Sequence, residues 1–322
     1  MELASLTILA TPGGQLTESH SLEDLPALLS GDSPCVWIDL VDPPPHQVRE
    51  VAAALGLHPL IAEDISESNE RAKVEHVGEM IHLVLFALSR NGAMTADELD
   101  FVLGPGFLLT VHPAGWDPRK AHQLKMGEGE VASKGPDHLL WALSDSIVDG
   151  YFPIFDQLAD EIEDLQDRVM ARPDRPTLQR VFDLRRELIR VRHVLGPSRE
   201  IFNQLTSREY PLIKDEQILY FRDVYDHLIR LTDDFDTYRE LVAATVEVYL
   251  STVNNNLSYI MKRLTGVTVV VAGIGALAGI FGMSEASTSV AGTEGIGFWI
   301  ISFVMLALAG VAIVVLRRVD WL

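Results

Sequence analysis

Leu264-Thr-Gly-Val-Thr-Val-Val-Val-Ala-Gly-Ile-Gly-Ala-Leu-Ala-Gly-Ile-Phe-Gly-Met283 is the stretch that decides the fold, because it carries no charged residue. A second uncharged stretch, Gly295 to Leu316, follows closely. Each is long enough to cross a hydrocarbon core of about 30 Å as a helix. Two adjacent stretches of this kind disfavour the buried core helix of a soluble protein. The sequence therefore predicts two membrane-spanning helices.

The basic residues around these stretches predict their orientation. Lys262 and Arg263 precede the first, Arg317 and Arg318 follow the second, and the loop between them contains no Lys or Arg. Lys and Arg concentrate on the cytoplasmic side of a membrane. We therefore expect a multi-pass protein of the cell (inner) membrane with both termini in the cytoplasm.

The outward loop, 284–294, then carries only two charges, Glu285 and Glu294. In a symmetric oligomer these carboxylates form a ring that attracts cations to a pore mouth. Taken singly, they are equally consistent with solvated loop residues.

Charge is unevenly distributed along the 322 residues. The net charge is −20, and residues 262–322 contribute four basic and three acidic groups, or +1, so residues 1–261 carry −21. Such a field repels nucleic acid and attracts cations, although an acidic surface also simply favours solubility. The N-terminus lacks the basic start of a secretory signal, so we expect the charged part to stay in the cytoplasm.

No enzyme motif is evident in the sequence. It contains no His-Glu-x-x-His, no Gly-x-Ser-x-Gly and no Gly-Lys of a phosphate-binding loop. Cys35 is the only cysteine, which excludes an internal disulfide and a site built from cysteines. We expect neither catalysis nor an organic cofactor. Scattered histidines such as His58, His76, His82 and His112 are interpreted as structural.

Residues 1–130 alternate short apolar runs with helical patterns, which predicts a cytoplasmic α/β domain. The expected strands are Leu3–Ala10, Cys35–Leu40, Met80–Leu88, Leu99–Leu103 and Phe107–His112, and the expected helices are Pro44–Leu55 and Asp117–Gly127. Residues 131–210 then predict long charged helices, one from Asp137 to about Met170 and one from Thr177 to about Val194, with breaks at Ala171–Asp174 and at Gly196-Pro197.

A third long helix is expected to form a stalk at 211–263 and to continue into the first span, 264–283. The second span is placed at 295–316 and a cytoplasmic tail at 317–322. No Pro or Gly interrupts the chain from Asp215 to Gly266, and a helix of about 70 residues reaches roughly 100 Å. Apolar residues at three and four spacing from Ile218 to Val253 form a packing seam. An isolated helix of this length is unstable, and copies of itself are its simplest support.

The seam continues into the span, where its residues are small or polar: Ser258, Met261, Thr265, Thr268, Ala272, Gly275, Gly279 and Gly282. Small residues allow close helix packing in lipid, and Gly275-x-x-x-Gly279 is typical of it. They also line pores, where hydroxyls offer oxygen ligands to a hydrated ion. The spacing alone does not distinguish a helix-packing face from a pore-lining face. A pore requires an oligomer, and in it Met261 and Leu264 suit a hydrophobic gate. Oxygen ligands suit magnesium.

Several stretches together resemble the CorA family of magnesium transporters over nearly the whole chain. They are Thr252–Thr265, Gly279-Ile-Phe-Gly-Met283 before a second span, Trp321-Leu322, Leu57–Ile65, Arg71–Glu75 and Tyr220–His227. The resemblance implies a funnel-shaped homopentamer that transports divalent cations, with the first span lining the pore. It also implies regulatory magnesium between a stalk acid, here Asp223, and an aspartate of a neighbouring subunit, whose place falls at the neutral Asn91.

The sequence departs from the family at the outer pore mouth. The family signature Gly-Met-Asn reads Gly282-Met283-Ser284, and the inner polar ring matches Ser258 in place of asparagine. Serine is shorter and offers fewer hydrogen-bonding groups, which bears on ion selectivity. Two alternatives stay open: the ZntB-like zinc-transporting branch of the superfamily, and a membrane-anchored metal sensor or scaffold that conducts nothing. The absence of histidine from both spans disfavours a dehydrated zinc site in the pore.

Overall fold

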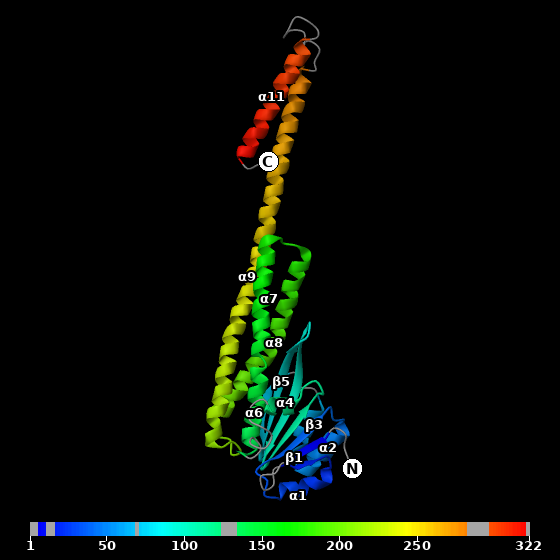
Figure 1. Cartoon of the computed structure of the whole chain (residues 1–322), viewed down its shortest axis with the longest axis vertical. Helices are drawn as coiled ribbons and strands as arrows, with labels where there is room; N and C mark the ends of the chain where they lie inside the picture. The colour runs from blue at the N-terminus through cyan, green and yellow to red at the C-terminus, as the bar shows by residue number, and fades with distance from the viewer. Residues whose placement is uncertain (1–5, 11–16, 68–70, 124–133, 282–295, 320–322) are drawn as a thin grey trace. The chain divides into compact units, whose positions relative to one another are not determined.

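The computed structural model describes residues 6–10, 17–67, 71–123, 134–281 and 296–319 (Figure 1). The chain divides into two compact units. The first contains Met1–Asp167 and Gln179–Ala244, and the second contains Arg168–Leu178 and Thr245–Leu322.

A mixed seven-stranded sheet forms the centre of the first unit, with the order β2-β1-β3-β7-β6-β5-β4. Its strands are β1 (Leu6–Ala10), β2 (Thr17–Ser19), β3 (Val36–Val41), β4 (Lys73–Val77), β5 (Met80–Arg90), β6 (Met94–Gly104) and β7 (Phe107–His112). Only β3 and β7 pair in parallel among these described strands; the other pairs are antiparallel. The predicted strand Phe107–His112 is confirmed.

Helices cover both faces of the sheet, which confirms the predicted α/β fold. One face packs against a short 3-10 turn, η2 (Leu22–Asp24), and three helices, α1 (Leu25–Leu29), α2 (Pro45–Leu55) and α3 (Pro59–Ser66). Val51, Leu55 and Ile61 from these helices join Ile38 and Leu109 of the strands in the core. The other face contacts α6 (Pro136–Asp149), next to α4 (Pro118–Gln123).

A chain of buried polar groups lies between β3 and β7. Trp37 Nε1 donates to Thr110 Oγ1 at 2.9 Å, Thr110 donates to Asp39, and His112 Nε2 lies 3.3 Å from Asp39 Oδ1. Burial lowers the pKa of His112, but the hydrogen bond and charge of Asp39 outweigh burial, so the pKa is raised. His112 of β7 is thus held against Asp39 of β3.

The long helices are α7 (Phe152–Ala171), α8 (Arg175–Ser207), α9 (Asp215–Phe281) and α11 (Ile296–Arg318). The prediction of one helix from Asp137 to about Met170 is wrong, because α6 ends at Asp149 and α7 begins at Phe152. Pro153 explains the break, since it cannot donate a backbone hydrogen bond and is tolerated only in a first turn. Tyr151 between them is buried and donates its hydroxyl to Phe86 O at 2.5 Å.

The predicted break at Gly196-Pro197 is also wrong, because α8 continues through both residues. Pro197 removes one backbone hydrogen bond, but Ser198 Oγ donates to Val194 O at 2.8 Å beside it. Buried Leu195 and Ile201 hold the helix on either side. Tertiary packing thus outweighs the local preference of proline.

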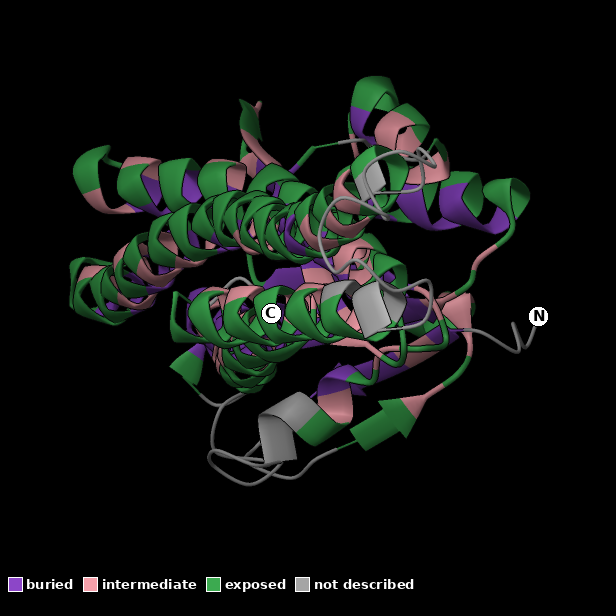
Figure 2. Ribbon diagram, turned by 90° about the horizontal axis from the view of Figure 1, so that it is seen from above, coloured by how far each residue is buried: buried purple, intermediate pink, exposed green. Residues whose placement is uncertain are grey.

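The prediction that α9 runs unbroken from Asp215 past Gly266 is confirmed. In the first unit its seam is buried at Phe221, Leu228, Leu231, Phe235 and Val242. The rings of Phe202 on α8 and Phe221 lie 6.2 Å apart, and those of Phe155 on α7 and Tyr238 lie 5.8 Å apart. The chain's own helices therefore support this part of α9, and the expected support by copies of itself is not needed there. Figure 2 shows helices with buried residues on one side and exposed residues on the other.

Candidate ion path and cation-binding residues

The last part of α9 is long and apolar enough to cross a membrane, and most of its side chains are exposed. All eight predicted pore residues that lie on it are exposed: Ser258, Met261, Leu264, Thr265, Thr268, Ala272, Gly275 and Gly279. Met261 and Leu264 are 53% and 60% exposed, values far from those of a packed helix. In water this surface is unfavourable, so it requires lipid or other chains.

The chain itself covers a different face of the same helix. Gly266 is buried, and Val270, Ile274 and Leu277 are partly buried. At about 100° per residue, these positions lie on the side of α9 opposite the seam formed by Thr265, Thr268, Ala272, Gly275 and Gly279. A Cβ added to Gly275 or Gly279 meets nothing within 4 Å. The two glycines therefore do not serve helix packing within the chain.

The helix α11 coincides with the second predicted span. Residues 296–316 carry no charge, and Arg317 and Arg318 form its last turn. Trp299, Phe303 and Leu306 are each more than 70% exposed. In Figure 1 its direction is opposite to that of the last part of α9. Gly282, Met283, Ser284, Glu285 and Glu294, predicted for the outer mouth, lie outside the described residues.

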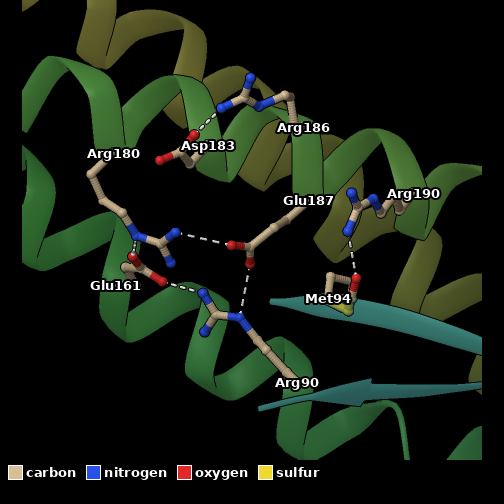
Figure 3. A network of polar contacts seen from close by, with 8 residues as sticks. All are labelled: Arg90, Met94, Glu161, Arg180, Asp183, Arg186, Glu187 and Arg190. Carbon is tan, nitrogen blue, oxygen red and sulfur yellow. Dashed lines mark hydrogen bonds and ion pairs between the residues drawn. The ribbon is translucent and has the colours of Figure 1, made fainter. Parts of the chain in front are cut away.

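Asn91 is exposed in the turn between β5 and β6, and an ionic cluster holds one end of this turn while a separate hydrogen bond holds the other (Figure 3). Arg90 Nε donates to Glu187 Oε2 of α8 at 2.9 Å, and Arg90 also donates to Glu161 of α7. Arg180 donates to both carboxylates, at 3.0 Å to Glu187 Oε1. Beyond the turn, Arg190 Nη1 donates to Met94 O at 2.6 Å.

The charges of this cluster balance, with two guanidinium groups and two carboxylates. Burial raises the pKa of Glu161, but hydrogen bonds from Arg180 and Arg90 outweigh it and lower the pKa. Glu187 is only 6% exposed and depends on the same two partners. The cluster therefore holds the turn that presents Asn91 against α7 and α8.

Asp223 is exposed on α9 and belongs to the first unit, like Asn91. Among the described residues, no hydrogen bond or ion pair joins the two within the chain. The structure thus does not bring the predicted regulatory pair together in one subunit. A pair shared between subunits, as the resemblance implies, is compatible with the exposure of both.

One turn from Asp223, the structure shows a group that the sequence reasoning missed. Asp145 and Asp149 of α6 and His227 of α9 place one ligand atom each within 4.8 Å of one another. His227 Nδ1 lies 3.4 Å from Asp149 Oδ1. The Asp-x-x-x-Asp spacing in Asp145-Ser-Ile-Val-Asp149 was a usable signal, because it places two carboxylates on one helix face.

Further along, acidic residues of α7 and α9 crowd around Tyr238. Burial raises the pKa of its phenol, and the charges of Asp234, Asp156 and Asp160 raise it further. Asp156 and Asp160 are exposed on α7, and no basic residue contributes to this shift. The local field is therefore negative and favours cations.

Comparison with known proteins places these features in a family. Residues 32–318 match a family described as "CorA-like Mg2+ transporter protein". The cobalt/magnesium transport protein CorA of Thermotoga maritima is 34% identical over 243 residues, which cover 74% of this chain and 69% of that protein. The complete structure of the CorA magnesium transporter from Methanocaldococcus jannaschii covers 100% of both chains, with a TM-score of 0.81 and 23% identity.

A zinc transport protein is a more distant relative. ZntB of Yersinia pseudotuberculosis is 22% identical over 304 residues, which cover 92% of this chain and 90% of that protein. This similarity extends over more of the chain than the similarity to CorA of Thermotoga maritima, but the sequence identity is lower.

Proposed function

The chain belongs to the CorA family of Mg²⁺ transporters, and from that premise we propose that it forms a homopentameric channel for Mg²⁺ or a similar divalent cation. The proposed cargo is that of the CorA-like Mg²⁺ transporter family and of the cobalt/magnesium transport protein from Thermotoga maritima. The number of subunits follows the resemblance to the family. Hydroxyls along the seam offer the oxygen ligands that Mg²⁺ and its bound waters prefer.

One observation carries the proposal: the small and polar seam of α9 lies opposite the only face that the chain covers along its described membrane part. A single chain leaves this seam open, and two helices do not enclose a pore. Five copies arranged around an axis would bring the five seams together and leave the covered faces outward. Lipid facing the seam is the competing arrangement, and it predicts no ion flux.

In the proposed topology both α9 and α11 cross the membrane, and both termini face the cytoplasm. The pairs Lys262-Arg263 and Arg317-Arg318 support this orientation, since Lys and Arg remain on the cytoplasmic side. Glu285 and Glu294 would then form acidic rings at the outer mouth, beside Gly282-Met283-Ser284.

The proposal also includes regulation by cytoplasmic Mg²⁺. Asp223 would bind the ion together with groups of a neighbouring subunit, and the ion would favour the closed channel. Asn91 removes one carboxylate from that site, which weakens its hold on Mg²⁺. The nearby group of Asp145, Asp149 and His227 supports cation binding in this region of the first unit.

The decisive experiment measures ion flux into liposomes that contain the purified protein. Mg²⁺, Zn²⁺, Co²⁺ and Ni²⁺ are compared under an imposed membrane potential. Mg²⁺ influx that increases with an inside-negative potential supports the channel. Zn²⁺ uptake without Mg²⁺ influx supports the zinc transporter, and a well-folded oligomer that passes no metal supports a sensor or scaffold.

The outer mouth is tested by Ser284→Asn, which restores the family asparagine. We expect stronger preference for Mg²⁺ over Co²⁺ and Ni²⁺, by about fivefold, because an amide adds a carbonyl acceptor and a donor for the hydrated ion. Ion competition assays in liposomes measure this preference. Ser287→Asn, in the same loop but outside the signature, is the matched control. Unchanged competition in Ser284→Asn places selectivity elsewhere in the pore.

A further inference from the structure

Three metal-ligating side chains converge at the edge of the sheet, on β4, β5 and α3. Asp64, Glu75 and His82 each offer one ligand atom, and these atoms lie within 4.8 Å of one another. Glu75 and His82 are direct cross-strand partners, which places their side chains on the same face. Asp64 is on α3, which packs on that face. All three residues belong to the first unit and are far in sequence from the predicted pore residues.

His82 has an arrangement typical of a metal ligand. It is 0% exposed, and its Nε2 lies 2.8 Å from Asp100 Oδ1. Its Nδ1 is buried and has no hydrogen-bond partner among the residues described. A buried polar atom without a partner costs about 1–3 kcal/mol. Metal-binding histidines commonly direct one ring nitrogen to a carboxylate and the other to the metal. Asp100 can therefore orient the ring, and Nδ1 is the nitrogen left for a ligand.

Lys73 lies beside two of the three groups, Asp64 and Glu75, and offsets part of their negative charge. Its Nζ lies 2.5 Å from Asp64 Oδ2 and 3.7 Å from Glu75 Oε2. The ammonium occupies the space beside the same two carboxylates that a metal needs. It is therefore a competitor that any bound metal displaces.

We propose that Asp64, Glu75 and His82 bind a divalent transition-metal ion, such as Zn²⁺ or Co²⁺, with Asp100 orienting the imidazole. One imidazole nitrogen and two carboxylates favour Zn²⁺ or Co²⁺ over Mg²⁺, which prefers oxygen ligands and its own waters. Asp100 also lines an open acidic cleft with Asp42, Asp97 and Glu98, which raises the local concentration of cations. The bound ion links α3 to the β4–β5 edge and is separate from the transported ion.

The test measures Zn²⁺ affinity of the full-length protein in detergent, by competition with a chromophoric chelator. Excess Mg²⁺ is added to the assay so that sites built from oxygen ligands alone are already occupied and do not bind Zn²⁺. We expect Glu75→Gln to weaken Zn²⁺ binding by about tenfold or more. Lys73→Met should strengthen binding by roughly tenfold, because it removes the competing ammonium. The control, Glu79→Gln, removes an exposed carboxylate from the adjoining turn and should leave the affinity unchanged.

The opposite effects of Lys73→Met and Glu75→Gln distinguish a site from a merely structural cluster. Equal affinity in Lys73→Met and the unmodified protein, or equal losses in Glu75→Gln and Glu79→Gln, overturns the proposal. Co²⁺ gives an independent readout, since its visible absorption should change in His82→Asn. If that variant fails to fold, the Lys73 and Glu75 variants decide. Binding is measured without flux, so the outcome does not depend on whether the channel conducts.

Discussion

At the residue scale, Arg90 shows how a side chain in the first unit depends on its partners. Among the described residues, Arg90→Met leaves Glu161 and Glu187 with Arg180 as their one remaining cationic partner (Figure 3), and Glu187 is nearly fully buried. Removing one partner of a buried ion pair costs about 3 kcal/mol or more. We therefore expect a clear fall in Tm, measured by tryptophan fluorescence in detergent.

Arg186→Met is the matched control for Arg90→Met. Arg186 donates to Asp183, three residues earlier on α8, but the side chain of Arg186 is 71% exposed. Exposed pairs contribute about 0–1 kcal/mol, so this variant should melt close to the unmodified protein. Equal falls in Tm for both arginines would contradict the role assigned to the cluster.

His112 predicts a pH dependence of stability. Its pKa in the folded protein is raised by Asp39 above the unfolded value of about 6.5, so the folded state binds the proton more tightly. The stabilisation is complete below that unfolded value and is lost as the pH rises through the folded pKa. His112→Gln should therefore lose more Tm at pH 5.5 than at pH 8.5. A difference from the unmodified protein that is constant across this range would contradict the prediction.

At the element scale, the proposed role of the α9 seam as the pore lining is tested by substituting two glycines of α9 that have equal space around them. Gly275 and Gly273 both meet nothing within 4 Å when a Cβ is added, but only Gly275 lies on the seam. Leucine replaces either glycine with similar local helix preference. Gly275→Leu should reduce Mg²⁺ flux by about tenfold or more, because five leucines would narrow the path. Gly273→Leu should leave flux within about twofold; equal effects would contradict a pore on the seam.

Long periodic elements were predictable from sequence, and short charged ones were not. The unbroken α9 follows from a long stretch without Pro or Gly, and the strand Phe107–His112 follows from a short apolar run. The edge strand β4, Lys73-Val-Glu-His-Val77, was missed because it is half exposed and carries three ionisable side chains. The course of α8 through Pro197 was missed because packing on distant residues decides it.

The candidate site was predictable only where one helix contains it. The seam from Ser258 to Gly279 is a repeat within α9, so spacing alone reveals it. The group of Asp145, Asp149 and His227 joins α6 to α9, and that of Asp64, Glu75 and His82 joins three elements. Such groups depend on tertiary contacts that a single sequence does not display. For the same reason the sequence favours a structural role for His82, and only the structure shows that its Nδ1 is buried without a partner among the described residues.

At the scale of the whole molecule, regulation is predicted to act between subunits. Asp223→Ala removes the exposed stalk carboxylate, so more internal Mg²⁺ should be needed to close the channel. We expect the inhibitory Mg²⁺ concentration in liposome flux assays to rise by about fivefold or more. Asp233→Ala, an exposed carboxylate further along α9, is the control. An identical dose response in Asp223→Ala would exclude the regulatory role.

The carboxylates of Asp156, Asp160 and Asp234 near Tyr238 have a consequence for the proposed response of the protein to cytoplasmic Mg²⁺. Ions distribute in a potential by a Boltzmann factor whose exponent contains their valence. Near a surface at −30 mV, K⁺ is enriched about threefold and Mg²⁺ about tenfold, since the divalent factor is the square of the monovalent one. A Mg²⁺-binding site in that layer would be exposed to the enriched concentration of Mg²⁺ and not to the bulk concentration. Added KCl screens the potential, so less Mg²⁺ should bind at the same bulk Mg²⁺ concentration.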